Sequence, residues 1–278
     1  MSLTEHVAHH DGRRLRYVTG GSGEPLVLLH GFLGSAENFE TWFDELSSRR
    51  TLIVPDLPGF GDSDPLRVAH TAEALAGAVE PLLRDLGVER FDLGGLCLGA
   101  SPALVMAQRH AGRVGRLVLH TPLLDPSLVR RRFHLQAGAM TAPGVFNGFL
   151  WLSRRRVVSD LYKRFMVEGD GVDRAAADMN FRNQTRANPR ATREWLRDGL
   201  RRRDVGLLER RADPTLVLLA AGDRIVDVPR MRALAQRLAS VQLECVAEAG
   251  HGWNAEFVRR QLAVLGAFLD GRPQALTA

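Results

Sequence analysis

The feature that most constrains the fold is a series of continuous apolar runs of strand length. Runs of about four to eight apolar residues without alternation are typical of strands that are buried on both faces of a parallel sheet. A sheet built from them needs helices on both of its faces. Five such runs occur along the chain, at residues 25–31, 51–59, 91–96, 116–124 and 215–223.

Helical segments separate these runs. The segment 71–87 begins with Thr71, ends at Gly87 and contains Pro81, where we expect a kink. Apolar residues recur three and four positions apart in the segments 228–240 and 253–271. Because strands alternate with helices, the sequence predicts an α/β fold with a mostly parallel central sheet, right-handed crossovers and flanking helices. A hairpin over 5–21, with an Asp-Gly turn, precedes it.

The alternation stops between Asp125 and Ala212, where the chain reads as mostly helical. We predict a core domain of residues 1–124 and 213–278 and a helical cap of residues 125–212. Such a cap lies over the strand ends, where open parallel sheets hold their ligands. The cap contains 19 Lys and Arg and 10 Asp and Glu, a net charge of +9, whereas the rest of the chain has 18 and 22, a net charge of −4. Three arginine triplets lie in the cap, at 130–132, 154–156 and 201–203. This asymmetry favours an anionic partner, and a solvated arginine face is the alternative.

Several classes of protein do not fit the sequence. The 278 residues contain no apolar run of the roughly 20 residues that a membrane-spanning helix needs, and the N-terminus lacks the apolar core of a signal peptide. We therefore predict a cytoplasmic protein, which the two cysteines also suit. No Cys/His spacing indicates a metal, and we expect no cofactor. The basic excess is local and lacks a nucleic-acid-binding motif, so no nucleic-acid partner is expected.

One cysteine stands where a nucleophile would. Cys97 is the centre of Gly95-Leu96-Cys97-Leu98-Gly99, between a predicted strand and a predicted helix. A tight strand–turn–helix of this form exposes its central side chain and needs small neighbours. The helix N-terminus favours a thiolate there. The alternative is a buried structural cysteine, which we expect for Cys245 in its strand-like run.

A nucleophile of this kind needs a base and an orienting carboxylate. His251 follows the last predicted strand and is the candidate base. Asp223 ends the strand run 215–223 and is favoured as the acid over Asp227 and Asp125. The alternative for Asp223 is a helix cap or a partner of Arg224. Six other histidines are predicted to lie at the surface: His6, His9, His10, His70, His110 and His134.

The loop after the first buried strand is the candidate oxyanion-binding site. Gly31 and Gly34 open the chain there, so the amide of Phe32 (or Leu33) and that of Leu98 can converge on a developing negative oxygen. His30 is then expected to hold this loop in place.

These motifs together resemble the α/β-hydrolase fold superfamily over nearly the whole chain. The resemblance rests on HGF at 30–32, DLPGFGDS at 56–63, GLCLG at 95–99, AAGDRIVD at 220–227 and GHGW at 250–253. It implies Cys97 as nucleophile, Asp223 as acid, His251 as base, and Phe32 and Leu98 as the oxyanion hole. Most members carry serine at the position of Cys97. A cysteine at this position resembles the dienelactone hydrolases and the polyhydroxyalkanoate synthases. An engineered replacement of serine by cysteine would give the same sequence.

The resemblance implies a hydrolase of a carboxylic ester or thioester that forms a covalent acyl-enzyme. The alternatives are an acyltransferase or cyclase that uses the same triad with an acceptor other than water, and an inactive binding protein on this scaffold. The expected partner is a small acyl substrate, with acyl-CoA or an acyl carrier protein as candidates for the anionic group. The sequence carries no information on the oligomeric state.

Overall fold

The computed structural model of the chain describes residues 3–142, 144–164, 174–246, 250–251 and 255–271. Its centre is an eight-stranded sheet in the order β1-β2-β4-β3-β5-β6-β7-β8. The pairs from β4 to β8 are parallel, whereas β1 and β2 pair with each other and β2 pairs with β4 in antiparallel fashion. The predicted mostly parallel α/β sheet is therefore confirmed. The strands are β1 Thr4–His10, β2 Arg13–Gly21, β3 Glu24–Leu29, β4 Arg50–Pro55, β5 Phe91–Leu96, β6 Val114–His120, β7 Thr215–Ala220 and β8 Val241–Val246.

The predicted N-terminal hairpin is also confirmed. Strands β1 and β2 pair from Thr4 opposite Thr19 to His10 opposite Arg13, so a two-residue turn joins them. Both turn residues, Asp11 and Gly12, have positive φ angles, of 52° and 69°. Turns of this hand match the right-handed twist of the strands, which is why Asp-Gly marks them.

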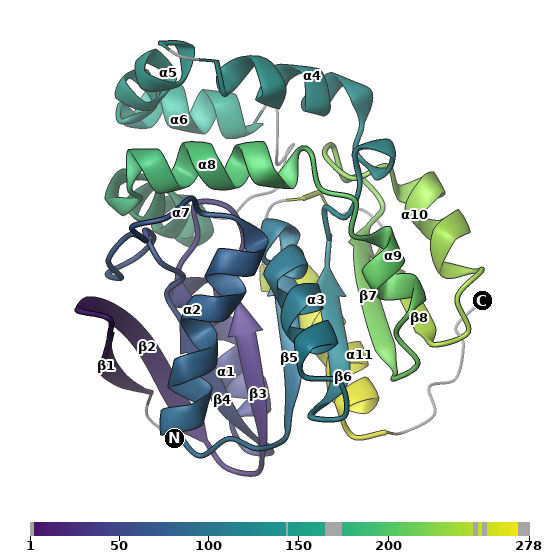
Figure 1. Cartoon of the computed structure of the whole chain (residues 1–278). Helices are drawn as coiled ribbons and strands as arrows, with labels where there is room; N and C mark the ends of the chain where they lie inside the picture. The colour runs from purple at the N-terminus through teal and green to yellow at the C-terminus, as the bar shows by residue number, and fades with distance from the viewer. Residues whose placement is uncertain (1–2, 143, 165–173, 247–249, 252–254, 272–278) are drawn as a thin grey trace.

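Helices cover both faces of the sheet (Figure 1). Alternate residues of the central strands enter two separate apolar clusters: Val27 and Leu29 face one, and Leu26 and Leu28 face the other. The first cluster lies under α2, α3 and α10, and the second under α1 and α11. The helices of the core are α1 Glu40–Leu46, α2 Ala72–Asp85, α3 Ala100–Arg109, α9 Val205–Glu209, α10 Val228–Ala235 and α11 Ala255–Leu269, with 3-10 turns η1 Ala36–Phe39 and η2 Cys97–Gly99.

The segment after β6 forms a helical layer over the carboxyl ends of the strands (Figure 1). It leaves the core at Leu124 and returns at Asp204, whose N–H donates to the Leu124 carbonyl at 2.7 Å. No helix in the described ranges has the length and apolarity to cross a bilayer. The layer consists of η3 Pro126–Leu128, α4 Arg131–Met140, α5 Val145–Ser153, α6 Arg156–Lys163, α7 Arg174–Arg186 and α8 Pro189–Gly199.

Candidate active site

Cys97 occupies a sharp turn between β5 and α3. Its φ angle is +51°, a strained value for a residue with a side chain. The flanking glycines leave no room for a methyl group: a Cβ at Gly95 would lie 2.5 Å from the Gly99 carbonyl oxygen, and one at Gly99 would lie 2.4 Å from that of His30. The sequence-based expectation that this turn needs small neighbours is confirmed. The thiol of Cys97 is free and half-buried.

Three loops at the carboxyl edge of the sheet bring a thiol, an imidazole and a carboxylate together. Nε2 of His251 lies 3.3 Å from Sγ of Cys97. Nδ1 of the same ring lies 2.8 Å from Oδ2 of Asp223. The side chains of Asp223 and His251 are 0% and 8% exposed, so both contacts are shielded from water. The arrangement places a base between a nucleophile and an orienting carboxylate, as covalent catalysis requires.

The remaining hydrogen bonds distinguish Asp223 from Asp227 and Asp125, the other two candidates for the orienting carboxylate. Oδ1 of Asp223 accepts from the N–H groups of Ile225 and Val226 at 2.7 and 2.8 Å, which fixes the carboxylate in the plane that reaches His251. Asp227 caps α10 by accepting from the Arg230 N–H. Asp125 caps η3 in the same way. Of the three candidates, Asp223, which the sequence favoured, is therefore the aspartate that contacts His251.

The charges of this group reinforce one another. Burial opposes protonation of His251, but the negative charges of Asp223 and Cys97 outweigh it and hold the pKa of His251 well above its ordinary value. Burial also opposes ionisation of Asp223, but His251 and two backbone N–H groups hold the pKa of this carboxyl below its ordinary value. The site therefore stabilises the ionised carboxylate of Asp223 and the protonated ring of His251.

His30 fixes the loop that follows β3. The side chain is fully buried; Nδ1 donates to the Gly31 carbonyl at 2.8 Å, and Nε2 accepts from the Leu57 N–H at 2.8 Å. Burial lowers the pKa of His30, which keeps it in the neutral form that these two bonds need. Its predicted structural role is confirmed. Phe32 and Leu98, the predicted oxyanion residues, both line the cavity at Cys97.

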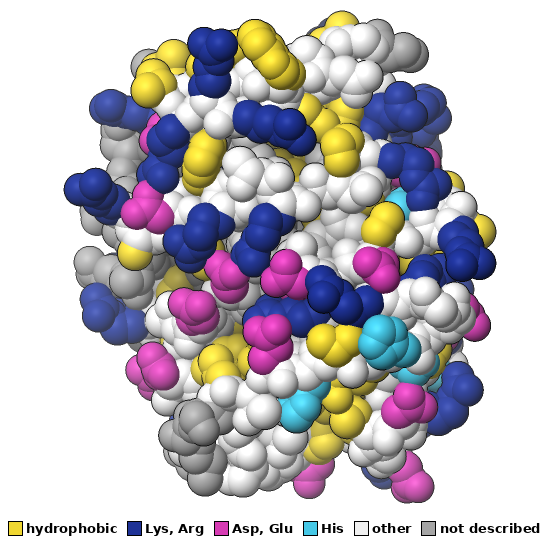
Figure 2. All heavy atoms as spheres, turned by 90° about the vertical axis from the view of Figure 1, so that its left-hand side faces the viewer, with side chains coloured by type: hydrophobic (Ala, Val, Ile, Leu, Met, Phe, Trp, Pro, Cys, Tyr) yellow, Lys and Arg dark blue, Asp and Glu magenta, His cyan; other side chains and the backbone are white. Residues whose placement is uncertain are grey.

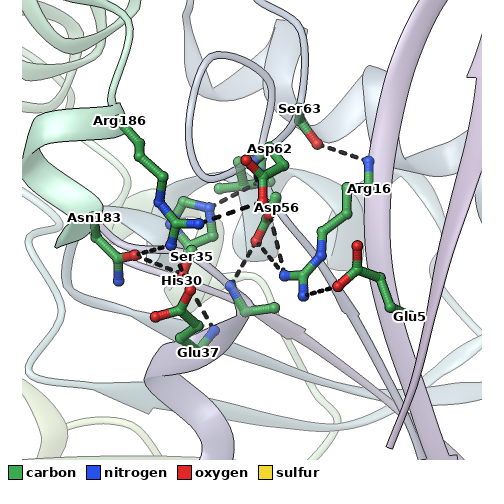
Figure 3. Close-up of polar contacts among 12 residues, drawn as sticks. Glu5, Arg16, His30, Ser35, Glu37, Asp56, Asp62, Ser63, Asn183 and Arg186 are labelled. Atoms are coloured by element: carbon green, nitrogen blue, oxygen red, sulfur yellow. Dashed lines mark hydrogen bonds and ion pairs between the residues drawn. The ribbon is translucent and has the colours of Figure 1, made fainter. Parts of the chain in front are cut away.

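A buried carboxylate also holds this loop (Figure 3). Oδ1 of Asp56, at the end of β4, accepts from the Ala36 N–H at 2.7 Å, and Oδ2 accepts from the Asp62 N–H at 2.9 Å. Arg16 on β2 contacts both carboxylate oxygens, at 3.4 and 3.3 Å. Asp56 is 0% exposed, so these partners replace the water that its charge has lost.

The cap is bound to this loop through α7 (Figure 3). Ser35 Oγ donates to Asn183 Oδ1 at 3.0 Å, and both residues are buried. Arg186 pairs with Glu37, and Arg182 reaches the same carboxylate at 3.2 Å. These contacts make α7 a fixed wall of the site rather than a separate layer.

The prediction that His70 lies at the surface is wrong. Its side chain is fully buried; Nδ1 lies 2.8 Å from Glu194 of α8, and Nε2 accepts from the Leu66 N–H at 3.0 Å. Glu194 lies 124 positions further along the chain, so no local sequence pattern could predict this hydrogen-bonded pair. The contact attaches α8 to the core.

A cavity of about 170 Å³ lies at Cys97 between the strand ends and the cap. Its wall is mostly apolar, and the cap helices α4 to α6 contribute much of it. The aromatic and aliphatic residues that line it are Phe32, Leu33, Leu96, Leu98, Leu123, Phe133, Ala137, Met140, Phe149, Tyr162, Leu196 and Ile225.

Sequence reasoning missed the polar residues that line this cavity beside His251, which are Asn38, His120, Thr121, Lys163, Asn180 and Gln184. His120 ends β6, and its Nε2 lies 2.6 Å from Oε1 of Gln261. Burial lowers the pKa of His120 to about 4, so this second imidazole of the site stays neutral near pH 7. A polar residue at the carboxyl end of a buried strand was the signal that could have identified His120.

The second cysteine has a different setting. Cys245 is free and half-buried on β8, where it packs against the larger apolar cluster. Burial raises the pKa of its thiol. In the described ranges, no group of three or more His, Cys, Asp or Glu side chains is arranged to hold a metal ion.

Comparison with known proteins agrees with this architecture. Residues 24–256 match the family described as alpha/beta hydrolase fold. Over 93% of its length the chain is 27% identical to the 2-hydroxymuconate semialdehyde hydrolase of Pseudomonas sp. (strain CF600), covering 91% of that protein. It is 36% identical over 117 residues to the soluble epoxide hydrolase of Corynebacterium sp. (strain C12), a match that spans 42% of this chain and 41% of the other.

Solved structures show the same fold. An esterase from Exiguobacterium antarcticum superimposes with a TM-score of 0.81 at 18% identity, over 95% of this chain and 98% of the other. A thermophilic esterase from Thermogutta terrifontis gives 0.78 at 23% identity, over 98% and 99%. The chain belongs to the α/β-hydrolase fold family. It is an enzyme of this type, with hydrolases among its relatives and esterases among the solved structures that share its fold.

Proposed function

We propose that the protein hydrolyses a carboxylic ester or thioester through a covalent acyl-enzyme on Cys97. The observation that supports this most directly is the position of His251, 3.3 Å from the thiol and 2.8 Å from Asp223. A ring held on both sides in this way can take a proton from the nucleophile and return it to a leaving group.

The first half-reaction transfers the acyl group to sulfur. The Cys97 thiolate attacks the carbonyl carbon of the substrate, and the carbonyl oxygen becomes an oxyanion that the amides of Phe32 and Leu98 stabilise. As the C–O or C–S bond to the leaving group breaks, the His251 imidazolium donates its proton to that group. The products are a free alcohol or thiol, a thioester on Cys97 and a neutral His251.

The second half-reaction returns the enzyme to its starting state. His251 takes a proton from water, and the resulting hydroxide attacks the thioester carbon. The C–S bond then breaks, the carboxylic acid leaves, and the thiolate–imidazolium pair is restored. Asp223 stays ionised throughout and stabilises the imidazolium.

The cavity supports an apolar acyl group as the substrate class. Its lining side chains are mostly aromatic and aliphatic, and Phe133, Met140 and Phe149 of the cap lie among them. Such a wall holds an acyl chain by burial of apolar surface. The relatives named as esterases and as a semialdehyde hydrolase define the first substrates to assay: short and medium acyl esters, acyl thioesters and 2-hydroxymuconate semialdehyde.

Acyl transfer to an acceptor other than water remains the second prediction, since a thioester intermediate serves both outcomes. Arg202, the middle residue of the triplet 201–203, gives little support to an anionic acceptor, whereas Arg201 and Arg203 are exposed. The Arg202 side chain is 10% exposed and pairs with Asp204 and Glu73. A rise in product with added thiol or alcohol acceptor, in place of free acid, would identify a transferase. A cytoplasmic location likewise remains a prediction.

The test of the proposal is the turnover of two variants at Cys97. Cys97→Ala should abolish hydrolysis and keep the fold, because a smaller side chain fits the same turn. Cys97→Ser should keep part of the activity, because His251 can activate a hydroxyl as well. Full activity of the alanine variant would refute the proposal.

A further inference from the structure

The outer surface of the cap is unusually apolar. Ten large apolar side chains are exposed in the part of the chain that the structure describes, and six of them belong to helices α4, α5 and α6. They are Leu135 (61% exposed), Val145 (53%), Trp151 (63%), Leu152 (43%), Val157 (79%) and Leu161 (57%). Helices α4 to α6 form the top of the molecule (Figure 1), and we call residues 130–163 the cap apex. Exposed apolar side chains in such a cluster indicate an interaction surface.

The same surface is cationic. Between residues 126 and 159 the chain contains six arginines and no aspartate or glutamate. Arg130, Arg131, Arg132, Arg154 and Arg155 are exposed. Among the described residues, none of these five forms an ion pair. Figure 2 shows arginine and apolar side chains interspersed over the top of the molecule.

The other half of the cap uses its arginines differently. Arg182 and Arg186 of α7 pair with Glu37, and Arg202, after α8, pairs with Glu73 and Asp204. These residues attach the cap to the core. Of the six apex arginines, only Arg156 forms ion pairs in the described part of the chain, with Asp160 and Asp178 of the cap itself. The guanidinium of Arg155 lies 5.2 Å from the ring centre of Trp151, a contact between a cation and an exposed aromatic face.

An anionic lipid surface fits both properties at once. Its phosphates match the arginines, and the boundary between headgroups and acyl chains takes up tryptophan and aliphatic side chains. A second copy of the chain would set the six apex arginines against six more. A soluble acidic partner would satisfy the arginines but would leave no role for exposed Trp151 and Val157.

The apex is also the outer side of the cavity wall. Phe133 and Met140 of α4, Phe149 of α5 and Tyr162 of α6 line the cavity. On the same three helices, Leu135, Trp151 and Val157 face solvent. A bilayer in contact with the apex would therefore lie directly across α4 to α6 from Cys97.

We propose that the cap apex docks on the surface of an anionic phospholipid bilayer, with Trp151 and Val157 inserted and the apex arginines on the phosphates. Docking would bring lipophilic acyl substrates to the cavity; this second part rests on the proposed function, whereas the docking itself does not. Binding is therefore measured with both the wild-type protein and Cys97→Ala, so that a failure of docking and a failure of catalysis are told apart.

The experiment is co-sedimentation with vesicles of phosphatidylcholine alone and of phosphatidylcholine mixed with phosphatidylglycerol. We expect both proteins to bind only the anionic vesicles and to be released by salt. Two variants should each lose binding by about tenfold or more: Arg131→Gln/Arg132→Gln/Arg154→Gln/Arg155→Gln, and Trp151→Ser/Val157→Ser. The matched control removes four exposed arginines elsewhere and should bind as wild type: Arg84→Gln, Arg90→Gln, Arg203→Gln and Arg237→Gln.

Thermal unfolding checks that every variant is folded, and turnover of a short soluble ester checks the surface variants that keep Cys97. Several outcomes overturn the proposal: no binding to anionic vesicles, equal loss in the matched control, or binding that needs the arginines but not Trp151 and Val157. The last result would indicate attraction by charge alone, which an acidic soluble partner would satisfy equally well. A dimer in size-exclusion chromatography that Trp151→Ser/Val157→Ser dissociates, without vesicle binding, would indicate a second copy instead.

Discussion

Asp223 holds His251 from the side opposite to Cys97, with 2.8 Å between Oδ2 and Nδ1. The carboxylate cannot turn away from the ring, because its other oxygen accepts from two backbone N–H groups. It thus fixes which ring nitrogen faces the thiol, and that orientation is what the proposed chemistry needs.

The first prediction concerns this carboxylate. Asp223→Asn should lower kcat by about a thousandfold or more, because the amide no longer stabilises the imidazolium or selects its tautomer. Asp227→Asn is the matched control: it alters a helix cap and should cost at most about 1 kcal/mol of stability with little change in rate. The two rates are measured by steady-state kinetics on one ester. A harmless Asp223→Asn beside a damaging Asp227→Asn would show that the acid is misassigned.

The second prediction is the titration of His251. Its pKa is raised well above 6.5 by Asp223 and Cys97, so removing either charge in Asp223→Asn or Cys97→Ala should bring it down. Nitrogen-15 NMR of the imidazole measures this shift. Because the folded pKa exceeds the unfolded one, the stabilisation is complete below pH 6.5 and is lost as the pH rises through the folded value. Equal His251 pKa values in wild type and both variants would contradict the ion-pair account.

The third prediction has the opposite sign and concerns His120. Its pKa of about 4 lies below the ordinary 6.5, so the folded protein resists its protonation. Stability should therefore fall as the pH drops from 6.5 towards 4, with His120 contributing about 3 kcal/mol of that loss. Urea unfolding of wild type and His120→Asn at several pH values tests this. The two stabilities should converge at low pH, and a constant difference would disprove the assignment.

The fourth prediction concerns the support of the oxyanion loop. Asp56→Asn should destabilise the protein by about 3 kcal/mol, because Arg16 loses its buried counter-charge and keeps only that of Glu5, whose side chain is exposed. It should also lower kcat, since the Ala36 amide is released near the loop. Asp11→Asn, at an ion pair on the exposed turn, should change stability by less than about 1 kcal/mol. Similar losses in both variants would argue against a specific role of the buried pair.

Much of the fold followed from local sequence. The apolar runs became β3 to β7, and Asp11-Gly12 became the hairpin turn, because strand burial and turn conformation depend on a few neighbouring residues. The candidate site followed from the strand-end positions of Cys97 and Asp223 and the loop position of His251. Parallel strands deliver their carboxyl ends to one edge, so residues far apart in sequence meet there.

What the sequence did not predict depends on long-range packing. His70 looked like a surface residue beside a helix, but Glu194, 124 positions away, provides its buried partner. The bond from Ser35 to Asn183 spans 148 positions. His120 lies at the end of a strand that the sequence predicted, but its contact with Gln261, 141 positions away, depends on long-range packing.

The arginine triplets show the same limit. In sequence the arginines of the triplets 154–156 and 201–203 are all alike, but Arg156 and Arg202 are partly buried in ion pairs. The other four, Arg154, Arg155, Arg201 and Arg203, are exposed. The burial of an arginine depends on how the cap helices pack, which the composition of the segment does not predict.

The most direct test of the account is to trap the acyl-enzyme. The protein is mixed with p-nitrophenyl esters and acyl thioesters, quenched in acid and examined by intact-protein and peptide mass spectrometry. We predict one acyl group on Cys97, which accumulates further in His251→Gln where the attack of water is slowed, and no adduct in Cys97→Ala. An adduct on Cys245 or on a serine, or turnover by Cys97→Ala at the wild-type rate, would contradict the assignment of Cys97 as the nucleophile.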